Sequence, residues 1–206
     1  LEDSQSRIRE LIAKEPNEIT RRRLEQSLSL IVAEAGMNKF RASRTALGAD
    51  EREKIKQEAD ALFIEATRLE GPALSDSEAV IANFLIQQND LTRAAVYQQR
   101  LLTELETAEE AVGNRRQVAA QLIRIELENE RLEEAEAVLD RYFKAADLAT
   151  GGSTLFGSLE FAKAEAQRKA DGGRDGGALS SASLDLLKKS EAHFADALTA
   201  DAGNSE

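Results

Sequence analysis

The sequence predicts an all-α protein built from antiparallel helix pairs, and three observations support this prediction. Helix-favouring residues (Ala, Leu, Glu, Arg, Gln and Lys) dominate the 206 positions. Only two prolines occur, and apolar residues recur at spacings of three and four, which is the period of an amphipathic helix. Short breaks rich in Gly, Asn or Pro separate these segments, so helices alternate with turns.

The amino-acid composition indicates what kind of core and which sites an all-α chain of this sequence can have. The hydrophobic content of 42% allows a core, but aromatic residues make up only 4% and Trp is absent. We therefore expect a core built mainly from Leu, Ile, Val and Ala. The chain has no Cys, which excludes disulfides and thiolate metal sites. No apolar run approaches the ~18 residues of a membrane-spanning helix, so we expect no membrane insertion. Nothing in the composition separates the cytoplasm from an exported compartment.

Turn residues divide the chain into one orphan helix and four pairs. Pro16, Gly71-Pro72 and the run Gly151-Gly152-Ser153 end one element before the next begins. Gly113-Asn114 is expected to break the chain in the same way. The expected ranges are residues 4–15 for the orphan helix and about 18–69, 76–111, 115–148 and 154–200 for the pairs.

The first pair consists of a helix over about 18–42 and a helix over 51–69, joined by a loop that contains Gly48. Gly36 is expected to weaken the last turns of the first helix, because glycine is a poor helix former. In these helices and the orphan helix, the positions expected to point inward are Ile8, Leu11, Ile12, Ile19, Leu24, Leu28, Ile31, Val32, Ala35, Ile55, Ala59, Leu62, Phe63, Ala66 and Leu69.

The second and third pairs carry capping signals at their helix starts. Ser75-x-x-Glu78 has the spacing of a capping box. Asp90 can cap the helix that follows it, and Asn114, with Gln117 as the reciprocal side chain, can cap another. The four expected helices cover 76–88, about 91–111, about 115–129 and about 132–148. Their expected apolar positions are Val80, Ile81, Phe84, Leu85, Val118, Leu122, Ile123, Ile125, Ala135, Val138, Leu139 and Tyr142.

The last pair is interrupted by a Gly-rich segment at residues 171–177, which we interpret as a linker. It lacks the ligand order of a calcium loop and the Lys-Ser/Thr of a phosphate loop. The helix before it is marked by Leu155, Leu159, Ala162 and Ala166. The helix after it covers about 183–200, and its expected inward positions are Leu184, Leu187, Phe194, Ala197 and Leu198.

A spacing of one small residue followed by larger apolar residues recurs in the second helix of each pair. The residues that carry it are Ala59, Phe63 and Ala66; Ala94 and Leu101; Ala135, Leu139 and Tyr142; and Phe194 and Ala197. In this spacing, and in the turns Gln88 to Leu91 and Asn129 to Leu132, the chain resembles the tetratricopeptide repeat family. It departs from the family pattern in two ways. Glu126 stands where the family has an aromatic, and Ala59, Ala94 and Ala135 are 35 and 41 residues apart instead of ~34.

The resemblance implies a right-handed α-solenoid of antiparallel helix pairs whose first helices line a concave face for a peptide or protein partner. The residues expected on this face are Asn83, Gln87, Gln117, Arg124 and Glu128. Their amide and charged groups can bond a peptide backbone or a carboxylate. Solvated polar positions without a binding role are an equally good interpretation. The family's carboxylate-binding set of Lys, Asn and Arg cannot be matched in this chain.

Charge and motif content argue against several other functions. The net charge is −11, and residues 57–206 carry 15 basic and 28 acidic side chains, so we expect no nucleic-acid partner. Residues 1–56 carry 12 basic and 10 acidic side chains, with one basic run at Arg21-Arg22-Arg23. No nucleotide-binding, zinc or EF-hand motif occurs, and the single histidine, His193, has no Ser or Cys motif beside it. We therefore expect no catalysis, cofactor or metal.

Three functional interpretations remain open. The preferred one is a scaffold or adaptor that binds a protein segment. The second is a self-assembly or regulatory segment of a larger enzyme or secretion complex, which would make the chain a homo-oligomer. An RNA-binding helical repeat is the weakest, because its first helices offer few cations. Both ends of the sequence resemble partial repeats, so we expect a segment of a longer repeat protein. The sequence does not identify the partner or the process.

Overall fold

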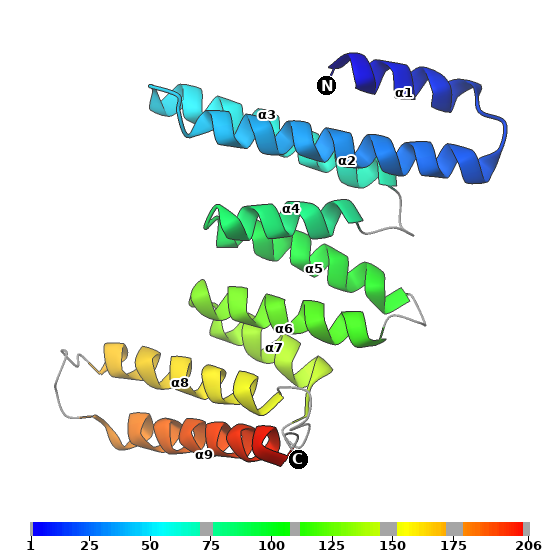
Figure 1. The fold of residues 1–206 in the computed structure, drawn as a ribbon. Coiled ribbons are helices and arrows are strands. Elements are labelled where there is room, and N and C mark those ends of the chain that lie inside the picture. The colour runs from blue at the N-terminus through cyan, green and yellow to red at the C-terminus, as the bar shows by residue number, and fades with distance from the viewer. Residues whose placement is uncertain (1, 71–75, 108–111, 145–151, 172–178, 204–206) are drawn as a thin grey trace. The chain divides into compact units, whose positions relative to one another are not determined.

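The prediction of an all-α protein is confirmed for the residues that the computed structural model describes, which are 2–70, 76–107, 112–144, 152–171 and 179–203. These residues form nine helices and no strand (Figure 1). The helices are α1 (Glu2–Lys14), α2 (Glu18–Ser43), α3 (Ala49–Glu70), α4 (Asp76–Gln87), α5 (Leu91–Thr107), α6 (Val112–Glu128), α7 (Leu132–Tyr142), α8 (Gly152–Ala170) and α9 (Ser181–Gly203).

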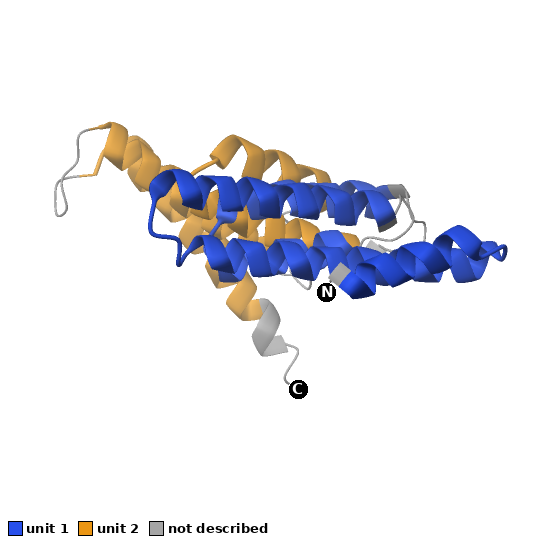
Figure 2. Ribbon diagram, turned by 90° about the horizontal axis from the view of Figure 1, so that it is seen from above, with its two compact units in different colours: residues 1–109 blue, residues 110–206 orange. Residues whose placement is uncertain are grey.

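The chain divides into two compact units, residues 1–109 and residues 110–206 (Figure 2). The first unit contains α1 to α5 and the second contains α6 to α9. Each unit has its own packed helix pairs. The sequence-based prediction of a single domain over residues 1–206 stays a prediction.

In the first unit, α2 and α3 form a long antiparallel hairpin. Lys39 pairs with Glu58, and Gly36 lies against Phe63, so rising numbers on α2 meet falling numbers on α3. Gly36 does not weaken α2, which continues to Ser43. A Cβ atom on Gly36 would lie 2.7 Å from the Phe63 ring. The glycine therefore allows a close approach between the two helices at Phe63.

The hairpin of α4 and α5 packs on the first one with like helices side by side. Gln26 donates to Asp76 at 2.7 Å, and Arg44 donates to Gln88 at 2.7 Å, so α2 and α4 run parallel. On the other side of the unit, α3 and α5 also run parallel. Arg93 on α5 pairs with Asp60 at 3.0 Å, and the rings of Phe63 and Tyr97 lie 6.1 Å apart.

The turns inside two hairpins have the same backbone geometry, one in each unit. Asn89 and Glu130 both have φ near 58°, in the left-handed region. In the first turn, Asp90 N–H donates to the Leu85 carbonyl and Asn89 N–H to the Ile86 carbonyl, both at 2.9 Å. In the second turn, Arg131 N–H donates to the Glu126 carbonyl at 2.9 Å, and Glu130 N–H donates to the Leu127 carbonyl at 3.1 Å. Both turns are thus Schellman motifs, which end a helix sharply.

In the second unit, α6 pairs with α7 and α8 pairs with α9. Ser190 on α9 donates to the Gly157 carbonyl on α8 at 2.8 Å, and Phe194 covers the same glycine. Between the pairs, Lys163 on α8 bonds Glu136 on α7 at 2.5 Å. The small residue Ala135 is fully buried, as are Ala59, Ala66 and Ala94 in the first unit. These burials confirm the inward positions predicted for Ala59, Ala66 and Ala135, whereas Ala197 in the last helix is only half-buried.

Three predicted helix boundaries are wrong. Helix α6 begins at Val112, so Gly113 and Asn114 lie within its first turn and Asn114 is not its cap. Helix α7 ends at Tyr142, because Phe143 is extended with φ −129° and ψ 151°. Helix α8 begins at Gly152, inside the run expected to separate the last pair. By contrast, Asp90 does accept from the Arg93 N–H at 3.4 Å, as a cap would.

Several residues expected to point inward are exposed. Leu198 is 73% exposed near the end of α9, and Ile19 is 67% exposed in the first turn of α2. The other exposed members of the expected core are Leu11, Val80, Leu184 and Phe194. The expected Ser75 capping residue, the Gly71-Pro72 stop, Gly151 and most of the 171–177 linker lie outside the described residues.

Candidate functional site

A face of the first unit combines exposed apolar side chains with ordered polar groups. It lies along the parallel helices α2 and α4, and we call it the α2/α4 face. Leu30 is 37% exposed and Val80 is 39% exposed. Each follows, by one helical turn, a member of the Gln26–Asp76 bond. The Phe40–Phe84 and Arg44–Gln88 contacts place Val80 farther along the face than Leu30.

One helical turn beyond Val80, Arg41 is held over the face. Its guanidinium lies 4.9 Å from the centre of the Phe84 ring and donates to Asn38 Oδ1 at 2.9 Å. Arg41 is exposed, and no ion pair joins it to a carboxylate within the described part of the chain. A stacked and hydrogen-bonded guanidinium loses little freedom on binding an anion, because its position is already fixed.

The predicted binding residues fall into two groups, one in each unit. Asn83 and Gln87 are exposed on α4, where they follow Val80 along the α2/α4 face. Gln117, Arg124 and Glu128 are exposed along one side of α6. All five therefore lie on the first helices of their pairs and are accessible from solvent. Their role in binding stays a prediction.

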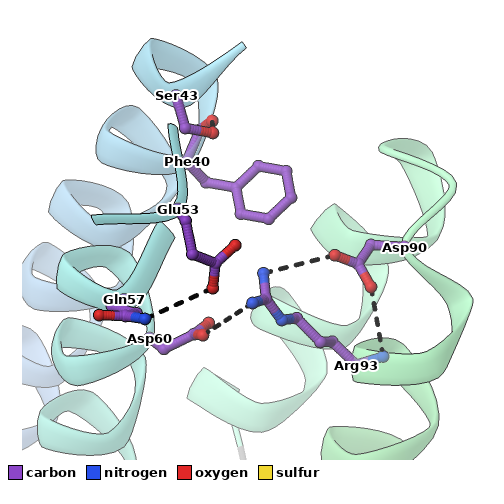
Figure 3. Close-up of polar contacts among 7 residues, drawn as sticks. All are labelled: Phe40, Ser43, Glu53, Gln57, Asp60, Asp90 and Arg93. Carbon is purple, nitrogen blue, oxygen red and sulfur yellow. Dashed lines mark hydrogen bonds and ion pairs between the residues drawn. The ribbon is translucent and has the colours of Figure 1, made fainter. Parts of the chain in front are cut away.

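An ion cluster joins the start of α5 to α3 (Figure 3). Arg93 bonds Asp60 at 3.0 Å and Asp90 at 3.5 Å, and its guanidinium lies 5.9 Å from the Phe40 ring centre. Burial raises the pKa of Asp60, while the charge of Arg93 opposes the shift. Every member has a partner inside the unit, so the cluster joins two hairpins rather than offering a free ligand site.

Four aromatic rings connect the helices of the first unit below the face. Phe40 contacts Phe84 edge to face at 5.6 Å, and Phe84 contacts Phe63 at 6.4 Å. Phe63 in turn contacts Tyr97, whose pKa burial raises to about 12. This chain of contacts runs from α2 through α4 and α3 to α5. It holds Phe84 in place, and Phe84 in turn positions Arg41.

A buried carboxylate, Glu126, lies near the end of α6, beside the α6–α7 turn. In the sequence it stood out only as a departure from the repeat pattern. Glu126 is 7% exposed, and its Oε2 lies 2.6 Å from Arg131 Nη2. Burial raises the pKa of Glu126, and Arg131 opposes the shift. Because the pair spans the turn, it ties the end of α6 to the start of α7.

A groove of about 530 Å³ lies between α1, α2 and α3. Its walls are mainly apolar, and the only charged side chain among its lining residues, Lys39, is paired with Glu58. The lining residues are Gln5, Ala35, Asn38, Lys39, Ala42, Ile55 and Leu62. The groove offers no acid–base pair and no ligand set for a metal ion.

Other chemistry is sparse in the described residues. They contain no group of three or more side chains that could hold a metal ion, and none of their helices is long and apolar enough to cross a membrane. His193 lies against the Phe156 ring, with ring centres 5.6 Å apart. The absence of catalysis stays a prediction.

Sequence reasoning missed Arg41, the most ordered cation of the α2/α4 face. Its partner Phe84 lies 43 positions away, and no local spacing relates the two residues. The available signal was Arg41 following Asn38 by three, which places both on one side of a helix. Comparisons with family models, with curated proteins and with solved structures give no match to this chain.

Proposed function

We propose that this protein is a protein–protein interaction scaffold that holds a peptide or protein segment on the first helices of its pairs, in a tetratricopeptide-like right-handed solenoid. Two features support the solenoid. In the first unit, first helices lie beside first helices and second helices beside second helices. In both units, a Schellman turn with a left-handed residue joins a helix pair.

The observation that carries the proposal is the α2/α4 face itself. It places two exposed apolar side chains, Leu30 and Val80, beside a guanidinium whose position is fixed. Isolated exposed apolar residues are common on protein surfaces. Two of them on one face, bordered by ordered polar groups, support this face as the candidate binding surface.

Capture of a partner tests the proposal. The chain would be immobilised, and bound proteins would be identified by mass spectrometry. The double variant Leu30→Glu/Val80→Glu should lose the captured partner, because two charges would replace the apolar contacts. Leu47→Glu is the matched control, since Leu47 is 97% exposed and lies off this face. Equal capture by both variants would refute a site on the α2/α4 face.

The same assay tests the two predicted groups separately. Asn83→Ala should weaken capture if the partner lies on α4, and Arg124→Glu should weaken it if the partner extends to α6. Far-UV circular dichroism would verify that each variant keeps its helix content. If neither variant changes capture, the binding role proposed for the two groups is wrong.

Self-assembly is a second candidate, and exposed residues of α9 favour it. Leu184 is 42% exposed and Leu198 is 73% exposed on this helix. Sedimentation velocity over a range of concentrations would test the candidate. Concentration-dependent association that Leu198→Glu abolishes would support it, and a monomer at every concentration would exclude it.

A further inference from the structure

The segment that contains Arg41 differs in charge from the rest of the chain. Residues 39–56, which contain Arg41, carry six basic and three acidic side chains, a net of +3 in a chain of net −11. Three cations of the first unit lie over aromatic rings: Arg41 over Phe84, and Lys56 and Arg93 over Phe40. Of these three, Arg93 is neutralised by two aspartates, whereas Arg41 has no such ion pair in the described part of the chain.

The geometry around Arg41 favours an anion as its partner. One guanidinium edge bonds Asn38, one face stacks on Phe84, and the side chain remains exposed. A guanidinium that retains free N–H groups binds carboxylates through charge-assisted hydrogen bonds. We propose that the α2/α4 face recognises a segment of a partner protein in which one acidic side chain binds Arg41 and a nearby apolar side chain contacts Val80. This inference rests on the proposed function and specifies its partner.

The distance between the two contacts sets the spacing in the partner. Phe84, which carries the guanidinium of Arg41, follows Val80 by four residues, or about 6 Å along α4. On α2, Arg41 follows Leu30 by 11 residues, about 16 Å, so Leu30 lies outside this span. An extended chain advances ~3.3 Å per residue, so about two to four residues of the partner cover the span between these contacts.

Charge on the same face limits the partner to an isolated acidic residue. Glu34 is exposed on α2 between Leu30 and Arg41. A polyacidic run would place a carboxylate near Glu34, and a nucleic acid would place phosphates there. Both would also be repelled by the net charge of −11. A single acidic residue beside neutral or apolar ones avoids this repulsion.

Nuclear magnetic resonance titration of the whole chain with short peptides tests the inference. The probe is a ten-residue Ser/Gly peptide that contains Leu-Ser-Ser-Glu, and its matched control has Gln in place of Glu. The amide signals of Leu30 to Arg41 and Val80 to Gln87 should shift with the Glu peptide. The Gln peptide should bind about tenfold more weakly, the effect expected from losing a charged hydrogen bond.

Protein variants localise the effect. Arg41→Gln should weaken binding of the Glu peptide about tenfold and leave binding of the Gln peptide unchanged. Arg22→Gln is the matched control, because Arg22 is an exposed arginine on the same helix that is already paired with Glu18 at 2.9 Å. Both variants change exposed side chains, and circular dichroism would verify their folding.

Each result separates the inference from the proposed function. The inference would be overturned by equal affinity for the two peptides or by equal losses in the two arginine variants. It would also be overturned by the absence of any shift at millimolar peptide, or by tighter binding of polyglutamate or of oligouridylate. If Leu30→Glu/Val80→Glu abolishes partner capture while Arg41→Gln does not, the proposed function stands and the acidic contact is wrong. If neither affects capture or peptide binding, both are wrong.

Discussion

The close approach of α2 and α3 at Gly36 allows a quantitative prediction for Gly36→Ala. The new methyl group would lie 2.7 Å from two atoms of the Phe63 ring, and carbon atoms prefer 3.5–4.0 Å. Phe63 is fully buried between Phe84 and Tyr97, so its ring cannot move aside. Overpacking of this kind costs about 1–3 kcal/mol, and replacing Gly by Ala in a helix returns about 1 kcal/mol. We expect a net destabilisation of about 1 kcal/mol.

Urea unfolding followed by circular dichroism measures this change, and a double-mutant cycle assigns its cause. In a Phe63→Leu background the clash is relieved, so Gly36→Ala should become neutral or stabilising there. Gly157→Ala is the comparison within the second unit. Its new methyl would lie 3.0–3.1 Å from the Phe194 ring, which is 36% exposed and free to shift, so little change is expected. The same free-energy change for Gly36→Ala in both backgrounds would refute the packing explanation.

Three further predictions concern the turns and the ion pairs. Asn89→Ala should destabilise the first unit by about 1 kcal/mol in urea unfolding, because Asn89 adopts φ 58° and alanine tolerates the left-handed region less well; an unchanged midpoint would contradict this. Arg93→Met should cost about 1 kcal/mol by leaving the half-buried Asp60 without its partner, and Asp60→Asn in the same chain should recover part of the loss. Burial raises the pKa of Glu126 above 4.5, so this group makes stability fall as pH rises from 4.5 through its folded pKa. Glu126→Gln should therefore show a smaller fall in urea midpoint over that pH range than the parent chain, and parallel pH profiles would exclude the effect.

The helices themselves could be predicted because their signals are local. Apolar residues at spacings of three and four predict a helix wherever it packs, and all nine helices lie on predicted segments. Two interruptions were misread for a physical reason. Gly113 was expected to break the chain but lies inside α6, and Gly36 was expected to weaken the last turns of a helix that continues to Ser43, close to its predicted end. Propensity alone does not show whether a glycine breaks a helix or allows a close approach.

The candidate site could be predicted only in part, because it depends on contacts distant in sequence. Helical periodicity placed Asn83 and Gln87 correctly on the exposed side of α4. It could not show that Arg41 stacks on Phe84, since that contact depends on α2 and α4 lying side by side. Periodicity also could not show that Leu198 stays exposed, because an apolar stripe is the same in sequence whether or not another helix covers it.

Photocrosslinking from position 83 tests the central claim most directly. A benzoylphenylalanine at Asn83 would lie on the α2/α4 face, and one at Thr103, an exposed residue of α5, would serve as the control. With a captured partner present, we predict a crosslink from position 83 and none from position 103. Crosslinking of that partner from position 103 alone, or equally from both positions, would contradict a binding site on the α2/α4 face.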